Sequence, residues 1–192
     1  DDIQASSRKY PGIIFKQGRD AGNQILSVNS ISKSLNGQSL FSKLTFEVNR
    51  GDKIAFISKS GLATTTLFQV LMDEQKADSG TFEYGQTITS AYLPTENGHY
   101  FNTKDNLIDW LRQYSEDKSE IYIRGFLGKM LFTGEEVFKS ASVLSGGEKV
   151  RCMLSRMMLN EANLLVIDEP TNHLDLESIQ AFNNGLKDYD GT

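Results

Sequence analysis

A glycine-containing loop, a helical pattern and an apolar run follow one another between Leu144 and Asp175, and this stretch constrains the fold more than any other. The loop Ser145-Gly146-Gly147 precedes apolar residues at helical spacing, which are Val150, Met153, Leu154, Met157 and Met158. A Ser-Gly-Gly start leaves the first N–H groups of a helix free to receive an anion, and phosphate is the usual one. The loop therefore predicts a phosphate-binding helix start.

The continuous apolar run over residues 164–167 is typical of a strand that is buried on both faces. It places Asp168 and Glu169 at its carboxyl end, where open α/β sheets bind ligands. An Asp carboxylate suits Mg²⁺, and a Glu carboxylate suits the deprotonation of a water molecule. The stretch as a whole thus indicates an α/β protein with phosphate and metal chemistry.

These residues together resemble the ABC ATPase family. Leu144-Ser-Gly-Gly-Glu148 is similar to the family's signature motif, Asp168-Glu169-Pro170 to the end of its Walker B strand, and Asn172-His173-Leu174-Asp175 to its D-loop. The spelling Glu-Pro-Thr-Asn-His-Leu-Asp resembles the ABC-F branch, whose members carry two ATPase domains on one chain and generally act on the translating ribosome. The resemblance implies a P-loop NTPase core with a small antiparallel β region and a helical signature subdomain.

Length and composition agree with a single globular domain. The chain has 192 residues, of which 39% are hydrophobic and 23% are charged. Its apolar runs are too short to cross a bilayer and no signal peptide opens it, so we expect a cytoplasmic protein without a membrane segment. The net charge of −5 gives no overall electrostatic footprint for nucleic acid. The single cysteine, Cys152, is expected in the core.

In chain order, residues 1–24 are interpreted as the end of an interdomain linker, with a weakly basic patch at residues 6–9, Lys16 and Arg19. Residues 25–192 form the expected nucleotide-binding domain. An alternating pattern over 25–31 and 40–48, with a turn at Asn36-Gly37, predicts a β region. We expect residues 53–58 and 164–168 to be strands of one mainly parallel sheet.

Helical spacing covers residues 106–114 and 120–132, with Asp105 and Ser119 placed as N-caps, inside a helical subdomain at about 104–142. Residues 176–186 are also helical. In the family, the next element is a strand between the Walker A and Walker B strands that ends in a switch His, and neither is present here. We therefore interpret the chain as the second nucleotide-binding domain of an ABC-F protein, truncated after the D-loop helix, with strand edges left open for self-association.

The family's Walker A loop falls on residues 58–67, where this sequence only half matches it. A P-loop reads G-x-x-x-x-G-K-[ST], in which backbone N–H groups cradle the phosphates and the Lys reaches the β- and γ-phosphates. Ser58 and Ala63 stand in place of the two motif glycines, and Thr64 stands in place of the Lys. Only Gly61 and Thr65 remain as in the family. We expect weak ATP binding that Thr64→Lys strengthens.

The resemblance implies that ATP lies between two ATPase halves. Mg²⁺ would be held by Thr65 and Asp168, with Thr95 in place of the Q-loop Gln, and Glu169 would act as general base. The expected nucleotide-binding residues are Ser58, Lys59, Ser60, Gly61, Leu62, Ala63, Thr64, Thr65 and Thr66 of the loop, Ser145, Gly146, Gly147 and Glu148 of the signature, and Asp175 of the D-loop.

Two other functions stay open at this point. The chain could be the ATP-binding subunit of a membrane transporter, although the Asn172-His173-Leu174-Asp175 spelling disfavours it. It could also be a degenerate half that dimerises without hydrolysing ATP, because its P-loop is substituted. Hydrolysis by the chain alone is not expected, since the switch His, the partner half and the P-loop Lys act as one unit.

Overall fold

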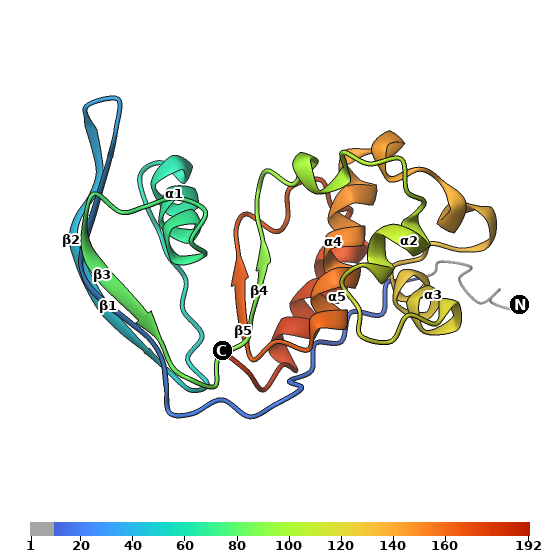
Figure 1. Ribbon diagram of the computed structural model, residues 1–192, viewed down its shortest axis with the longest axis horizontal. Helices are drawn as coiled ribbons and strands as arrows, with labels where there is room; N and C mark the ends of the chain where they lie inside the picture. The colour runs from blue at the N-terminus through green and yellow to red at the C-terminus, as the bar shows by residue number, and fades with distance from the viewer. Residues whose placement is uncertain (1–9) are drawn as a thin grey trace, which may run out of the picture. The chain divides into compact units, whose positions relative to one another are not determined.

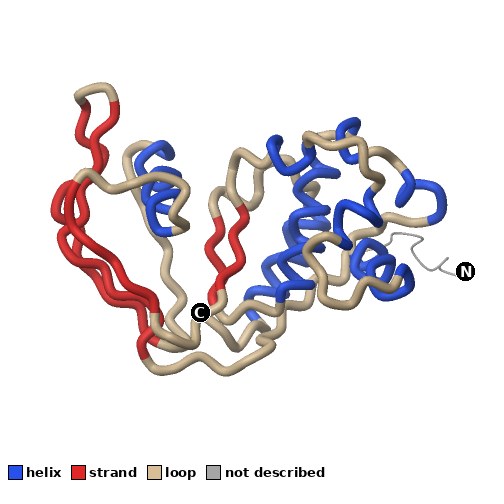
Figure 2. The backbone as a smooth tube through the Cα atoms, in the orientation of Figure 1, coloured by secondary structure: helices blue, strands red, loops and turns tan. Residues whose placement is uncertain are grey.

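The computed structural model describes residues 10–192, which divide into two compact units (Figure 1). Within the described residues, unit 1 contains 10–15, 97–159 and 173–189, and unit 2 contains 16–96, 160–172 and 190–192. By their residue ranges, the strands, red in Figure 2, belong to unit 2, whereas most of the helices, blue, belong to unit 1. Residues 6–9 of the expected basic patch lie outside the described residues, whereas Lys16 and Arg19 lie within them.

Unit 2 contains an antiparallel sheet of three strands. It contains β1 (Gln24–Leu35), β2 (Gln38–Asn49) and β3 (Ser79–Tyr84) in the order β2-β1-β3. The β1–β2 hairpin turns at Asn36, with φ of 50°, and Gly37, with φ of 79°. Two successive positive φ values are the requirement of a type I′ turn, which Asn-Gly meets at low cost. The predicted β region is therefore confirmed.

A second, parallel pair of strands lies in the same unit. β4 (Ser90–Leu93) runs beside β5 (Leu164–Ile167), with Ser90 opposite Leu164. The helix α1 (Gly61–Leu71) contributes Leu67, Phe68 and Leu71 to the unit's hydrophobic core. This core also contains apolar side chains from β1, β2, β4 and β5, which are Ile25, Leu26, Val28, Ile31, Val48, Tyr92, Leu164 and Val166.

The strand predicted over residues 53–58 is absent. This segment belongs to no strand, and within the described residues β4 is the only strand that pairs with β5. Ile54 is 48% exposed and Ile57 is 94% exposed. A strand exists only when a neighbour accepts and donates its backbone hydrogen bonds, and no adjacent strand offers them here. The prediction of a single mainly parallel sheet was therefore wrong.

The other edge of β5 is contacted by the last residue of the sequence. Thr192 N donates to the carbonyl of Asn163 at 3.1 Å, and Leu165 N donates to the carbonyl of Thr192 at 2.9 Å. Asp168 N, by contrast, donates to Leu93 in β4. Since alternate N–H groups of a strand point to opposite edges, Thr192 forms one parallel rung on the side away from β4.

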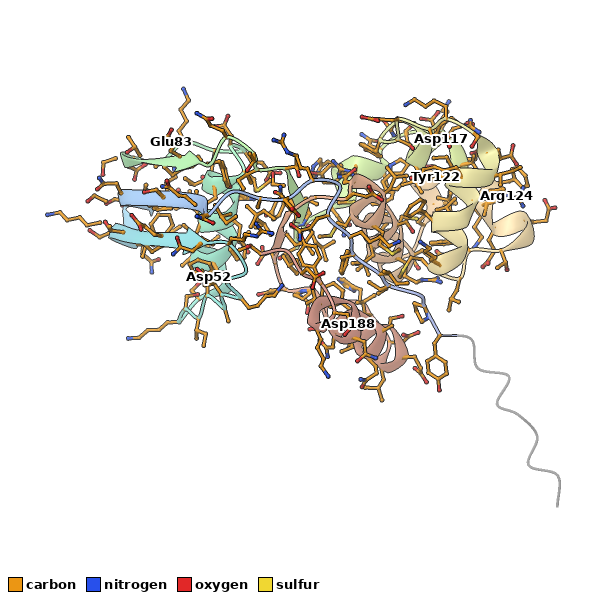
Figure 3. The ribbon with its side chains drawn as sticks, turned by 90° about the horizontal axis from the view of Figure 1, so that it is seen from below. Asp52, Glu83, Asp117, Tyr122, Arg124 and Asp188 are labelled. Atoms are coloured by element: carbon orange, nitrogen blue, oxygen red, sulfur yellow. The ribbon has the colours of Figure 1, made fainter. Side chains whose placement is uncertain are left out.

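Unit 1 is helical. Its elements are η1 (Gly98–Phe101), α2 (Leu107–Arg112), α3 (Glu120–Lys129), η2 (Gly134–Phe138), η3 (Ala141–Val143), α4 (Gly146–Asn160) and α5 (Leu176–Lys187). Figure 3 shows Tyr122 and Arg124 on α3. Trp110 stacks on Phe101 with ring centroids 4.6 Å apart and is fully buried, so it is part of this unit's core. Within residues 10–192, each helix is too short or too polar to cross a membrane.

The helix boundaries confirm most of the sequence-based expectations. Ser119 is the N-cap of α3, as predicted, but the N-cap of α2 is Asn106 and not Asp105. The Asn106 side chain accepts a hydrogen bond from Asp109 N at 2.9 Å, so the cap lies one residue later than predicted. All five apolar residues predicted on the face of α4 are buried, as is Cys152.

Candidate functional site

Thr65 and Asp168 are brought together in unit 2, although they are far apart in sequence. The Thr65 hydroxyl donates to Asp168 Oδ2 at 2.7 Å. Asp168 follows β5 and is only 2% exposed, while Thr65 lies in the first turns of α1. A hydroxyl and a single carboxylate oxygen are the oxygen donors that Mg²⁺ uses when substrate phosphates complete its coordination. The pair therefore fits the predicted metal role.

Thr95 lies beside the same strand end. Its hydroxyl donates to the backbone carbonyl of Asp168 at 3.4 Å, a long hydrogen bond. Thr95 thus contacts the backbone, and not the carboxylate, of the predicted metal ligand. Within residues 10–192, no cluster of three or more His, Cys, Asp or Glu side chains could hold a metal by itself. A metal here would therefore depend on Thr65, Asp168 and the bound phosphates.

The Glu169 carboxylate faces the start of α1. A Cβ added at Gly61 would lie 2.8 Å from Glu169 Oε1, so the absence of a side chain at Gly61 makes room for the carboxylate. Glu169 Oε2 accepts a hydrogen bond from the Asn172 amide at 2.8 Å. Glu169 has a φ of 46°, a conformation that non-glycine residues adopt infrequently and that recurs at functional sites. The geometry suits a base held near the phosphate loop.

The phosphate loop leads into α1 with its helix start uncapped by side chains. Ser60 is the N-cap residue, but its side chain accepts no hydrogen bond from the helix. The neutral residues that replace the family's Gly and Lys contact each other, because Ser58 Oγ lies 2.8 Å from Thr64 Oγ1. The N–H groups of the first turn can receive an anion, but the substituted position 64 supplies no positive charge.

The signature loop forms the start of α4 in unit 1. Ser145 N donates to Glu148 Oε2 at 2.8 Å, and Glu148 N lies 3.3 Å from Ser145 Oγ. This reciprocal pair is a capping box, and it fixes the loop to the first turn of the helix. Lys139 forms an ion pair with Glu148 at 2.9 Å. The Ser145 N–H and then Lys139 lower the pKa of Glu148 to about 2.

The D-loop approaches the signature glycines closely. A Cβ at Gly147 would lie 2.8 Å from the backbone oxygen of His173, and one at Gly146 would lie 3.3 Å from the His173 ring. Asp175 is the N-cap of α5, where Oδ1 accepts from Ser178 N at 2.7 Å. The Ser178 hydrogen bonds lower the pKa of Asp175. Close packing against His173 therefore requires a glycine at position 147. The Asp175 carboxylate already has a structural partner, the Ser178 N–H.

Sequence reasoning missed several of these contacts. The spacing Ser145-x-x-Glu148 is itself a capping-box pattern and could have been found. The Lys139 ion pair, the Asn172 amide on Glu169 and the Ser58–Thr64 contact join residues whose spacing carries no signal. They become visible only once the chain is folded.

Comparison with known proteins agrees with this geometry. The sequence profile described as "ABC transporter" matches residues 41–172. The chain belongs to the ABC transporter family of ATP-binding domains. The ABC transporter ATP-binding protein YkpA of Bacillus subtilis is 56% identical over the whole chain, which covers 36% of YkpA.

More distant relatives share this ABC domain. ABC transporter F family member 5 of Arabidopsis thaliana is 29% identical over 96% of the chain and 27% of its own length. The energy-dependent translational throttle protein EttA of Escherichia coli is 29% identical over 93% of the chain and 33% of its length. The ABC domain described here thus spans about a third of the curated relatives that it matches.

The fold is also that of solved ABC proteins. An ATP-binding subunit of an ABC transporter superposes with a TM-score of 0.67 at 22% identity, covering 84% of this chain and 73% of that one. At this identity the likeness establishes the fold alone. The α/β ABC ATPase fold, with its small antiparallel sheet and its helices, is therefore confirmed for this domain.

Proposed function

We propose that this chain is one ATPase half of a soluble ABC-F protein, which binds ATP and Mg²⁺ together with a second ATPase half. The observation that carries the proposal is the 2.7 Å contact between Thr65 and Asp168, which pairs a loop hydroxyl with a buried carboxylate at the start of α1. The intact signature loop and the position of Glu169 support it further. Each supplies a part that hydrolysis by the family requires.

In the proposed mechanism, each residue has a distinct task. The first N–H groups of α1 receive the phosphates, while Thr65 and Asp168 would hold Mg²⁺, which would neutralise phosphate charge. Glu169 accepts a proton from the attacking water, and Asn172 orients its carboxylate through the 2.8 Å hydrogen bond. Ser145 and the N–H groups at the start of α4 contact ATP held by the partner half.

A non-hydrolysing role for the chain's own loop is the second candidate, and one contact favours it. Ser58 and Thr64 replace the motif Gly and Lys, and their hydroxyls bond to each other. The loss of a lysine's charge-assisted bonds weakens phosphate binding by roughly 10- to 150-fold. The intact signature would then serve mainly the ATP of the partner half.

Hydrolysis by the chain alone tests the non-hydrolysing candidate. Because the partner half is missing, we expect phosphate release from Mg·ATP to be no greater than that of a Glu169→Gln variant. Steady-state release well above this control would show that the chain's own loop is competent without a partner. In the same assay, Thr65→Val and Asp168→Asn are matched controls that remove the proposed metal ligands.

We also propose that the protein acts in the cytoplasm on the ribosome. The support comes from EttA, which is described as a translational throttle, and from the F family relative. Sedimentation of the chain with purified ribosomes, with and without Mg·ATP, tests the proposal. We expect ATP to increase the amount that co-sediments, and Asp168→Asn to abolish the increase. Equal amounts with and without ATP would contradict a nucleotide-dependent role on ribosomes.

A further inference from the structure

Two hydroxyl groups in the phosphate loop form a directed chain of hydrogen bonds. Ser58 Oγ donates to the backbone oxygen of Ser60 at 2.6 Å and lies 2.8 Å from Thr64 Oγ1. A hydroxyl has one proton, and a carbonyl oxygen can only accept. Because the Ser58 proton is directed to Ser60, the bond between the two hydroxyls must be donated by Thr64. The chain therefore runs from Thr64 through Ser58 to the backbone of Ser60.

This direction determines what Thr64 can offer to a ligand. Thr64 lies in the first turns of α1, next to Thr65, where the loop is proposed to receive phosphate. Phosphate oxygens accept hydrogen bonds and have no proton to give at this position. A hydroxyl whose proton points to Ser58 presents lone pairs to the phosphate and cannot donate to it. Thr64 must first give up its bond to Ser58 before it can bind a phosphate.

We infer that Ser58 sets the nucleotide affinity of this loop by holding the proton of Thr64 away from the phosphates. The inference rests on the proposed function, in which the loop receives ATP. Ser58 is a positioning residue in this scheme, because it acts on the ligand only through Thr64. Its removal frees the Thr64 proton, and it also removes the hydrogen bond to the backbone oxygen of Ser60.

The test measures ligand affinity in a double-mutant cycle on the chain. The variants are Ser58→Ala, which removes the acceptor, Thr64→Val, which removes the donor at equal size, and the double substitution. Calorimetric titrations use Mg·ATP, Mg·ADP and adenosine, which has no phosphate. Thr45→Val is a matched control, because it removes the hydroxyl that lies 3.5 Å from Ser30 Oγ in the β1–β2 hairpin.

We expect Ser58→Ala to bind ATP and ADP about 2- to 10-fold more tightly, the range of one neutral hydrogen bond. The gain should disappear in the double variant, which should bind like Thr64→Val, and adenosine binding should be equal in all of them. Weaker or unchanged ATP binding by Ser58→Ala would overturn the inference. So would a gain that persists in the Thr64→Val background, since it would come from a looser loop.

Amide hydrogen exchange without nucleotide separates this inference from the proposed function. If the chain of hydroxyls exists, Ser58→Ala, which removes both of its bonds, should accelerate exchange at the start of α1 at least as much as Thr64→Val, and the double variant no more than Ser58→Ala. If this pattern is seen but no variant binds Mg·ATP at millimolar concentration, the proposed nucleotide site fails and the inferred control of affinity fails with it. If amide exchange at the start of α1 is unchanged in all variants, the hydrogen-bond chain does not exist and the inference is overturned, whatever the ATP affinity.

Discussion

Single residues at the start of α4 show how closely the signature and the D-loop are fitted. Gly146 and Gly147 are adjacent, but they face different parts of His173. A Cβ at Gly147 would lie 2.8 Å from a backbone oxygen, whereas one at Gly146 would lie 3.3 Å from a side-chain ring. A ring can rotate away by a few tenths of an ångström, but a backbone carbonyl moves only with its peptide. The two glycines therefore differ in how well they tolerate substitution.

We predict that Gly147→Ala lowers the free energy of unfolding by roughly 1–3 kcal/mol, the range for overpacking. Gly146→Ala should change it by less than about 1 kcal/mol, because the better helix propensity of Ala offsets a small displacement of the ring. Urea denaturation of both variants measures the difference. Equal losses would show that the D-loop backbone does not limit position 147.

The lowered pKa of Glu148 predicts that the free energy of unfolding depends on pH. Its pKa is lowered from its ordinary value of 4.5 to about 2 by Ser145 N–H and then Lys139. A carboxyl with a lowered folded-state pKa stabilises the protein above its unfolded pKa and loses that contribution as the pH falls through the folded value. We expect Glu148→Gln to lose less stability than the unmodified chain between pH 4.5 and pH 2. Denaturant unfolding across this range measures it, and parallel curves would contradict the prediction.

At the scale of elements, one buried amide connects the strands that carry the site. Asn163 stands directly before β5 and is fully buried. Its Oδ1 accepts from Thr89 N at 2.9 Å, and its Nδ2 donates to the carbonyls of Thr87 at 2.9 Å and Arg19 at 3.3 Å. The amide thus ties the starts of β4 and β5 together. The strand ends that place Thr95 and Asp168 depend on this register.

Asn163→Ala should therefore destabilise unit 2. It leaves the backbone N–H of Thr89 and the backbone carbonyl of Thr87 without their side-chain partner, and an unsatisfied group costs about 1–3 kcal/mol where the fold shields it from water. We expect a loss of at least this size in urea unfolding, together with weaker binding of Mg²⁺ at Asp168. Asn183→Ala, at an exposed position of α5, is the control and should change stability by less than about 0.5 kcal/mol. Similar losses for both would argue against a structural role of the amide.

At the scale of the whole molecule, the segment over residues 53–58 exposes apolar side chains that the described fold does not cover. It contains Ile54 and Ile57, which are 48% and 94% exposed, and it forms no strand in the described part of the chain. At the start of the segment, Lys53 Nζ donates to the carbonyl of Gly191, and just before it Gly51 N donates to the Thr192 hydroxyl. Exposed apolar side chains, on a segment whose backbone pairs with no strand, favour association between copies of the chain.

We predict that the chain self-associates and that Ile57→Lys reduces the association. The charge should prevent apolar contact and discourage strand pairing at this segment. Light scattering over a concentration series measures the mass of both proteins. Ile121→Lys is the matched control, because Ile121 is 88% exposed on α3, far from 53–58 in the sequence. A stable monomer at high concentration of the unmodified chain would contradict the prediction.

Local patterns in the sequence determined the elements whose stability is local. The helical spacing after Gly147 identified the buried face of α4, the apolar run at 164–167 identified β5, and Asn36-Gly37 identified a hairpin turn. The resemblance to the ABC family predicted Thr65 and Asp168 as metal ligands, because the family places a hydroxyl and a carboxylate at these positions. Their approach to 2.7 Å agrees with that expectation.

Only the tertiary structure decided features that need a partner from elsewhere in the chain. Residues 53–58 have the composition of a buried strand, yet they form none, because a strand is stabilised by hydrogen bonds to a neighbour that a local pattern cannot reveal. The hydrogen bond between the Ser58 and Thr64 hydroxyls joins two neutral residues, and no sequence pattern marks it. The contact of Gly147 with the His173 carbonyl joins residues far apart in the sequence, so it leaves no periodic pattern either.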